Sequence, residues 1–135
     1  MTFLVDTSVW SLAFRRDTPS EQPEVQALRE ALVGGEPVAA TGLILTELLR
    51  GFVPKRAQAV IREQFAYVEL IEPARADYEA AAELANTCRS HGVQLGTVDA
   101  LIAQLAVSRE LTLLTTDGDF AHAAAFIPLR LWGQR

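Results

Sequence analysis

The chain has 135 residues, of which 17 are acidic and 12 basic, and its formal net charge at neutral pH is −5. The length suits one domain, because compact domains cluster around about 100–150 residues. The hydrophobic share of 50% excludes intrinsic disorder, and a single cysteine excludes a disulfide framework or a cysteine-based zinc site. The acidic balance excludes a bulk basic surface for nucleic acid, so a polyanionic partner needs a local basic patch or a bound metal.

The amino-terminal segment has none of the features of an export signal. It reaches an acid at Asp6 without a basic region or a small-residue cleavage site. No apolar run approaches the about 18–20 residues that a membrane span needs. We therefore expect a cytoplasmic protein with no membrane association and one domain over residues 1–135.

Short apolar runs alternate with longer amphipathic stretches along the chain. In chain order, the pattern predicts a strand at 3–5, helices at 8–15 and 24–33, a strand at 38–40, helices at 42–52 and 55–66, a strand at 67–71, helices at 74–90 and 97–109, a strand at 111–114, a short helix and a last strand at 129–131. Thr41 and Thr97 are expected to cap the helices that follow them. Alternating strands and helices indicate an α/β fold with a mainly parallel sheet covered on both faces.

Acidic residues fall where such sheets bind ligands, beyond the carboxyl ends of the strands. Asp6 follows the first predicted strand, and Asp117 and Asp119 follow the fourth. Asp99 lies in the first turn of a predicted helix. Glu47 lies at the edge of an apolar helix, where burying a lone carboxylate would be costly.

Taken singly, each acid has a structural explanation that is at least as good as a role in ligand binding or catalysis. Asp6 can cap a helix, and Asp99 can complement a helix dipole. Glu47 can pair with Arg50 three residues later, and the two aspartates after the fourth strand can form an ordinary turn.

Taken together, acids that converge from several strand and helix ends would repel one another unless a cation or a proton compensates them. Oxygen donors without a histidine or cysteine cluster favour Mg²⁺ or Mn²⁺ over zinc. The chemistry that fits such a set is metal-assisted hydrolysis of a phosphodiester.

Four blocks of the sequence resemble, in order and spacing, those of the PIN-domain ribonucleases, and within them the VapC toxins of bacterial toxin–antitoxin pairs. The blocks are residues 4–10 with the first acid, 46–51 with the second, 96–103 with the third and 113–120 with the closing Asp-x-Asp-Phe. The resemblance implies a three-layer α/β/α sandwich and an endoribonuclease that depends on Mg²⁺ or Mn²⁺. It also implies RNA as substrate, a homodimer, and inhibition by a VapB-like antitoxin protein.

The resemblance also assigns roles to the acids. Asp6, Glu47, Asp99 and Asp117 carry over as the catalytic, metal-binding set. Asp6 and Asp99 are implied as direct ligands, and Glu47 and Asp117 as residues that bind a second ion or orient water. Asp119 is a fifth, secondary member.

Two hydroxyl residues beside these acids are candidates for a supporting role. Ser8 and Thr116 can hydrogen-bond the carboxylates or a water on the metal, and the alternative for both is capping of a helix or turn. His91, His122 and Cys88 are interpreted as structural. For Arg15 and Arg16, a solvated loop is preferred to contact with RNA phosphate.

Two other functions stay open at this point. One is a module with the same fold that binds RNA or protein without turnover. The other is a phospho-acceptor receiver-type domain, which would need an acidic pair after the first strand and a lysine after a late strand. Asp6 stands alone and Lys55 lies in an early helix region, so the receiver function is disfavoured.

Overall fold

The computed structural model describes residues 1–15 and 17–133, so Arg16 lies outside the described residues. In chain order the elements are β1 (Phe3–Val5), α1 (Thr7–Ala13), α2 (Pro23–Gly34), β2 (Val38–Thr41), α3 (Gly42–Gly51), α4 (Lys55–Phe65), β3 (Glu69–Ile71), α5 (Arg75–Ser90), α6 (Thr97–Ser108), β4 (Thr112–Leu114), α7 (Gly118–Ala123) and β5 (Arg130–Leu131). Every strand predicted from the sequence is present, with shifts at the ends.

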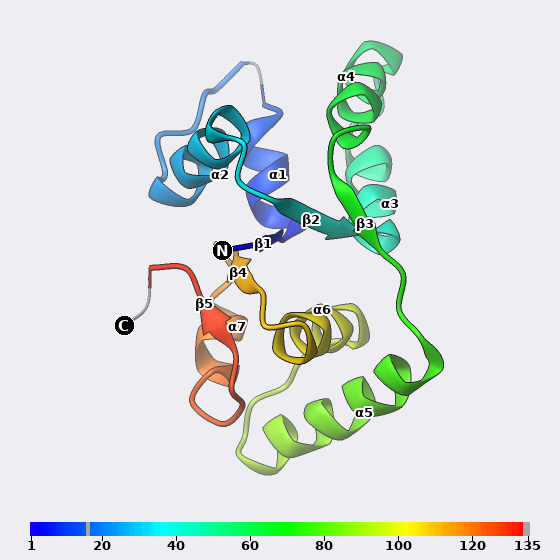
Figure 1. Cartoon of the computed structure of the whole chain (residues 1–135), viewed down its shortest axis with the longest axis vertical. Helices are drawn as coiled ribbons and strands as arrows, with labels where there is room; N and C mark the ends of the chain where they lie inside the picture. The colour runs from blue at the N-terminus through cyan, green and yellow to red at the C-terminus, as the bar shows by residue number, and fades with distance from the viewer. Residues whose placement is uncertain (16, 134–135) are drawn as a thin grey trace.

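The strands form one parallel sheet in the order β3-β2-β1-β4-β5. Helices α1 to α4 gather on one side of this sheet and α5 to α7 on the other (Figure 1). The architecture is therefore the three-layer α/β/α sandwich that the sequence predicted. Because β1 lies at the centre, the segment after it is flanked by the ends of β2 and β4.

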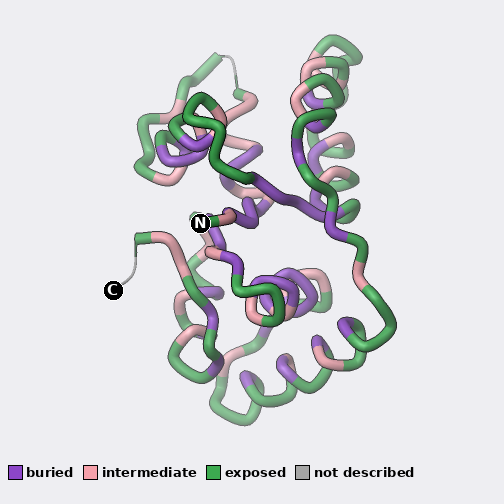
Figure 2. Tube along the Cα trace, viewed as in Figure 1, coloured by how far each residue is buried: buried purple, intermediate pink, exposed green. Residues whose placement is uncertain are grey.

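Burial follows the position of each strand in the sheet. All residues of β1 and β2 are buried, whereas two of the three residues of β3 are exposed. Figure 2 shows the buried residues along the middle of the sheet and on the inward sides of the helices. This is the pattern expected when helices cover both faces of a parallel sheet and its edge strands are polar.

Helices α5 and α6 form an antiparallel pair below the sheet. Asp77, near the start of α5, accepts hydrogen bonds from Arg109 at the end of α6, with oxygen–nitrogen distances of 3.1 and 3.2 Å. In residues 1–15 and 17–133, no helix combines the length and the apolar character that crossing a membrane requires.

The structure corrects three details of the sequence prediction. Helix α1 begins at Thr7 and ends at Ala13, not at residues 8 and 15. Tyr67 belongs to a turn, since its N–H bonds the carbonyl of Gln64, and β3 is accordingly shorter than predicted. Thr41 caps α3 as expected, accepting the N–H of Ile44 at 3.2 Å, but Thr97 is already helical and caps nothing.

Candidate metal centre at the carboxyl edge of the sheet

Asp6 occupies the centre of this edge because β1 is the central strand. Val5 is in register with Leu114 of β4, and the N–H of Asp6 donates to the carbonyl of Leu114 at 2.9 Å. The residues that follow on the two strands are Asp6 and Thr115. Thr115 Oγ1 donates to Asp6 Oδ2 at 2.9 Å, which joins two segments 109 positions apart.

A second hydroxyl holds the same carboxylate oxygen. Ser8 Oγ donates to Asp6 Oδ2 at 2.9 Å and accepts the backbone N–H of Thr116 at 3.1 Å. Asp6 is only 6% exposed. It is the N-cap residue of α1, but its side chain makes no capping hydrogen bond. Ser8 thus contacts the carboxylate as predicted, whereas Thr116 contributes a backbone group, and the side chain that reaches Asp6 is its neighbour Thr115.

Glu47 and Asp117 each have one carboxylate oxygen engaged in the same way. Thr7 Oγ1 donates to Glu47 Oε1 at 2.8 Å, which links the first turn of α1 to α3. Asp117 caps α7, because its Oδ1 accepts the N–H of Asp119 at 2.9 Å. Glu47 is exposed, so its carboxylate does not bear the cost of burial considered from the sequence. The alternative of an ion pair with Arg50 is also absent from the ion pairs of the described residues.

Asp99 lies in the first turn of α6 and is half-buried. Burial, which is the largest cause, and repulsion from Asp6, Asp117, Glu47 and Asp119 together raise its pKa from 3.8 to about 6. All four carboxylates therefore lie within electrostatic reach of Asp99. We call these five residues the acidic cluster.

No basic side chain in the described part of the chain neutralises the acidic cluster. The ion pairs there join Arg109 to Asp77 and Arg130 to Glu110. The cluster is therefore a concentration of uncompensated carboxylates, the donor type that Mg²⁺ and Mn²⁺ prefer. Within residues 1–15 and 17–133, however, no three of these donors are close enough together to form a ready-made ion site.

Sequence reasoning missed two residues, Thr7 and Thr115. Thr115 is the first residue after β4 just as Asp6 is the first after β1, but only the observed register of the two strands identifies the pair. Adjacent parallel strands in register place such residues side by side. No sequence signal paired Thr7 with Glu47, since that contact depends on how α1 packs against α3.

The comparison with protein families decides where this fold belongs. The model of the PIN domain family matches residues 3–125. The chain belongs to the PIN-domain family. No curated protein matches the chain closely enough to count as a relative.

Solved structures with the same fold include several toxin–antitoxin proteins. This PIN domain is similar to VapBC2 from Rickettsia felis bound to a promoter DNA fragment, with a TM-score of 0.77, 20% identity, and 97% of each chain covered. It is similar to DNA-bound VapBC from Salmonella typhimurium, with a TM-score of 0.76, 17% identity, and coverage of 97% of this chain and 96% of that one. It is also similar to VapC20 from Mycobacterium tuberculosis, a sarcin–ricin loop cleaving toxin, with a TM-score of 0.66, 21% identity, and coverage of 95% and 98%.

Proposed function

We propose that this PIN domain is an endoribonuclease that depends on Mg²⁺ or Mn²⁺ and acts as the VapC-like toxin of a toxin–antitoxin pair. The observation that carries the proposal is the convergence of five carboxylates at the carboxyl edge of the sheet without a compensating base. In this proposal residues 1–135 act as one domain in the cytoplasm.

The hydrogen bonds of the acidic cluster support a role in holding a cation. Asp6 Oδ2, Glu47 Oε1 and Asp117 Oδ1 each accept hydrogen bonds from the protein. The second oxygen of each carboxylate receives none of these bonds and is left for a cation. Asp6 and Asp99 would hold the ion directly, and Glu47 and Asp117 would hold a second ion or orient water.

When bound, a divalent ion supplies Lewis acidity toward the phosphate of the substrate. The protein's part is to orient the donors, because the hydroxyls of Ser8 and Thr115 fix the carboxylate of Asp6 in one rotamer. The exposed carboxylates of Glu47 and Asp119 leave the cluster open to a large substrate. Asp119 acts here as a secondary residue, through the N–H that it donates to Asp117.

One observation favours a second function, a PIN fold that binds RNA or protein without cleaving it. The donors of the acidic cluster stand too far apart, within the described residues, to form an ion site as they are placed. Metal-dependent catalysis requires the carboxylates of the acidic cluster to move closer together around the ion, whereas a binding module requires no such rearrangement. Turnover by the purified protein distinguishes the two.

The proposed partners are a VapB-like antitoxin and a second copy of the chain. Two of the similar structures are VapBC complexes bound to DNA. The net charge of −5 suits an inhibitor with basic residues near the acidic cluster. Light scattering of the purified chain, alone and with a candidate VapB-like protein, tests both partners.

The decisive experiment is cleavage of structured RNA by the purified chain with Mg²⁺ or Mn²⁺. We expect cleavage that a chelator stops and that Asp6→Asn abolishes, with a loss of at least about 100-fold. The exposed Glu83→Gln substitution on α5 is the matched control and should leave the rate unchanged. Cleavage that persists in the Asp6→Asn protein would remove the acidic cluster from the mechanism.

A further inference from the structure

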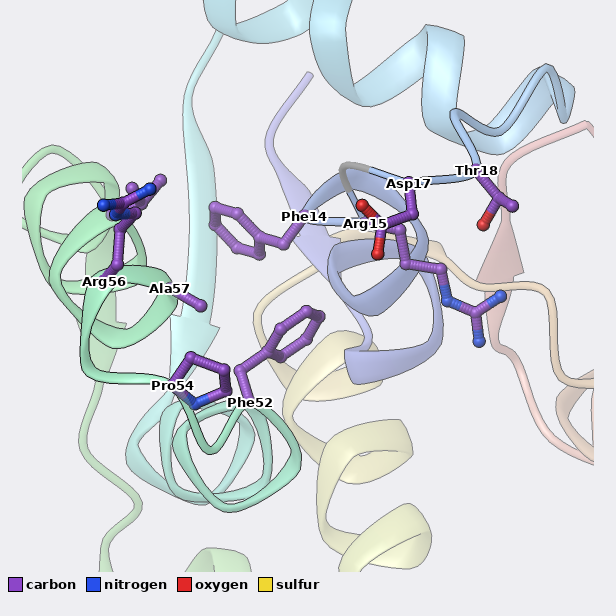
Figure 3. Close-up of a pocket in the computed structure, with 9 residues that line it drawn as sticks. Phe14, Arg15, Asp17, Thr18, Phe52, Pro54, Arg56 and Ala57 are labelled. Carbon is purple, nitrogen blue, oxygen red and sulfur yellow. The ribbon is translucent and has the colours of Figure 1, made fainter.

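A cavity of about 450 Å³ lies between the end of α1 and the turn from α3 to α4. Its apolar lining includes Phe14, Phe52 and Pro54, and Arg15 and Arg56 line it as well. Figure 3 shows Phe14 and Phe52 between the helix that carries Arg56 and the segment that carries Arg15. The cavity thus has an aromatic wall with an arginine on either side of it (Figure 3).

The buried ring of Trp10 holds the aromatic rings of the cavity in place. Trp10 stacks on Phe14 with ring centroids 5.7 Å apart and packs against Phe65 at 4.8 Å. Trp10 is 1% exposed, and its Nε1 donates to the carbonyl of Val5 at 3.1 Å. Phe52 meets Phe14 edge-on at 6.3 Å. A ligand that enters the cavity therefore meets a pre-formed aromatic surface.

The charge around the cavity is opposite to that of the whole chain. Residues 42–65, which form α3, α4 and the turn between them, carry four basic side chains against two acidic, a net charge of +2 in a chain whose total is −5. The two ion pairs of residues 1–15 and 17–133 involve Arg109 and Arg130, so no ion pair of the described residues neutralises the cations near the cavity. Only Asp17 adds a negative charge to the lining. Such a local basic patch favours an anionic ligand.

Two helices connect the cavity to the acidic cluster. Thr7, which donates a hydrogen bond to Glu47, begins α1, and Phe14 follows the last residue of that helix. Seven helical residues span about 10 Å. Glu47 lies on α3, and Phe52 follows the last residue of that helix. The cavity therefore lies about one length of α1 away from the carboxylates, so a single strand of RNA can reach both sites.

We propose that this cavity is a subsite for an unstacked nucleobase of the RNA strand, with the neighbouring phosphates on Arg15 and Arg56. The proposal rests on the ribonuclease function proposed above. Aromatic rings stack on any base and arginines pair with phosphates, which is how proteins commonly hold single-stranded RNA. Because the distance to the acidic cluster is fixed, the subsite selects a nucleotide at a constant offset from the cut.

Binding of a labelled single-stranded RNA of mixed sequence tests the proposal in the Asp6→Asn protein, where cleavage is removed. We expect Arg15→Glu combined with Arg56→Glu to weaken binding about tenfold or more and to reduce the salt slope by about 2. Phe52→Leu, which keeps an apolar side chain but removes the ring, should weaken binding about tenfold with an unchanged Tm. Arg75→Glu makes the same charge change at an exposed position of α5, on the other side of the sheet, and should change the affinity less than about twofold.

Mapping the ends of a randomised RNA pool, cut by proteins that retain Asp6, gives a second readout. The parent protein should show a nucleotide preference at one offset, and the Phe52→Leu protein should lose it while cleavage continues. If the parent cleaves but the cavity variants bind and select as it does, the subsite is overturned, and the cavity is left to a protein partner. If the parent binds RNA through the cavity but never cleaves it, the subsite stands and the ribonuclease function fails.

Discussion

Thr115 has a larger role in the acidic cluster than its position in a loop suggests. Its hydroxyl donates to Asp6 Oδ2 at 2.9 Å and accepts the N–H of Asp117 at 3.0 Å. A single side chain therefore orients two members of the cluster. Groups that orient metal-binding residues in this way commonly affect function almost as much as the ligands themselves.

Replacing this hydroxyl by a methyl group in Thr115→Val should lower kcat/KM for RNA by about 10–100-fold. Asp6 loses one of its two donors, and the N–H of Asp117 loses its acceptor. We expect the free energy of unfolding to fall by about 1–2 kcal/mol at the same time. Steady-state cleavage and urea denaturation measure the two effects. Thr115→Ser retains the hydroxyl and should keep most of the activity, and an equal loss in both variants would contradict the assignment.

The positions of the acids were predictable from the sequence, but the contacts of the hydroxyls were not. Asp6 and Asp117 follow short apolar runs, and the ends of parallel strands meet at one edge. Choosing between Thr115 and Thr116 required the register of β1 against β4, which a run of three apolar residues does not define. The contact of Thr7 with Glu47 required the packing of two helices.

At the scale of elements, the pairing of α5 with α6 determines where Asp99 stands. Asp77 accepts the N–H of Ala74 at 2.8 Å and two hydrogen bonds from Arg109, and it is buried. The Arg109 guanidinium, helped by the N–H of Ala74, holds the pKa of Asp77 below its ordinary value of 3.8. Because α6 carries Asp99 at its other end, this ion pair helps to fix the helix that bears Asp99 against α5.

Asp77→Asn should lower the free energy of unfolding by about 1–3 kcal/mol near neutral pH. A carboxyl group whose pKa is lower in the folded state stabilises the protein when the pH is above the ordinary pKa. This stabilisation is lost as the pH falls through the folded-state pKa. The difference between parent and variant should therefore shrink below about pH 4. Chemical denaturation at neutral and at acidic pH measures it.

The exposed Glu83→Gln substitution on the same helix is the control and should cost less than about 0.5 kcal/mol. A difference between parent and Asp77→Asn that stays constant with pH would contradict an ionic contribution. The sequence predicted both helices but not this pairing, since Asp77 and Arg109 are 32 positions apart. A long-range ion pair leaves no periodic signal in either helix.

At the scale of the whole molecule, the fold gathers like charges that an unfolded chain keeps apart. The pKa of Asp99 rises to about 6 because burial and four neighbouring carboxylates disfavour its charged form. Because the pKa of Asp99 is raised in the folded state, its protonation stabilises the protein fully when the pH is below the unfolded-state pKa of 3.8. This stabilisation disappears as the pH rises through about 6. At neutral pH, repulsion within the acidic cluster therefore lowers the stability of the metal-free folded protein.

We expect Asp99→Asn to raise the Tm of the chelator-treated protein near neutral pH, because it removes one charge from the cluster. The gain should vanish toward about pH 4, where Asp99 of the parent is protonated. Saturating Mg²⁺ should raise the Tm of the parent more than that of the variant. A pH series of thermal melts, with chelator and with Mg²⁺, tests this, and a variant that melts below the parent at neutral pH would refute it.

The 109 positions between Asp6 and Thr115 have a consequence for the chain as the ribosome makes it. Asp6 is synthesised 109 residues before Thr115, and β4, which completes its surroundings, must then take its place beside β1. Until that step the emerging polypeptide holds its acids on separate, unassembled segments. The surroundings of Asp6 therefore assemble only once residues 112–117 have been synthesised and β4 has paired with β1.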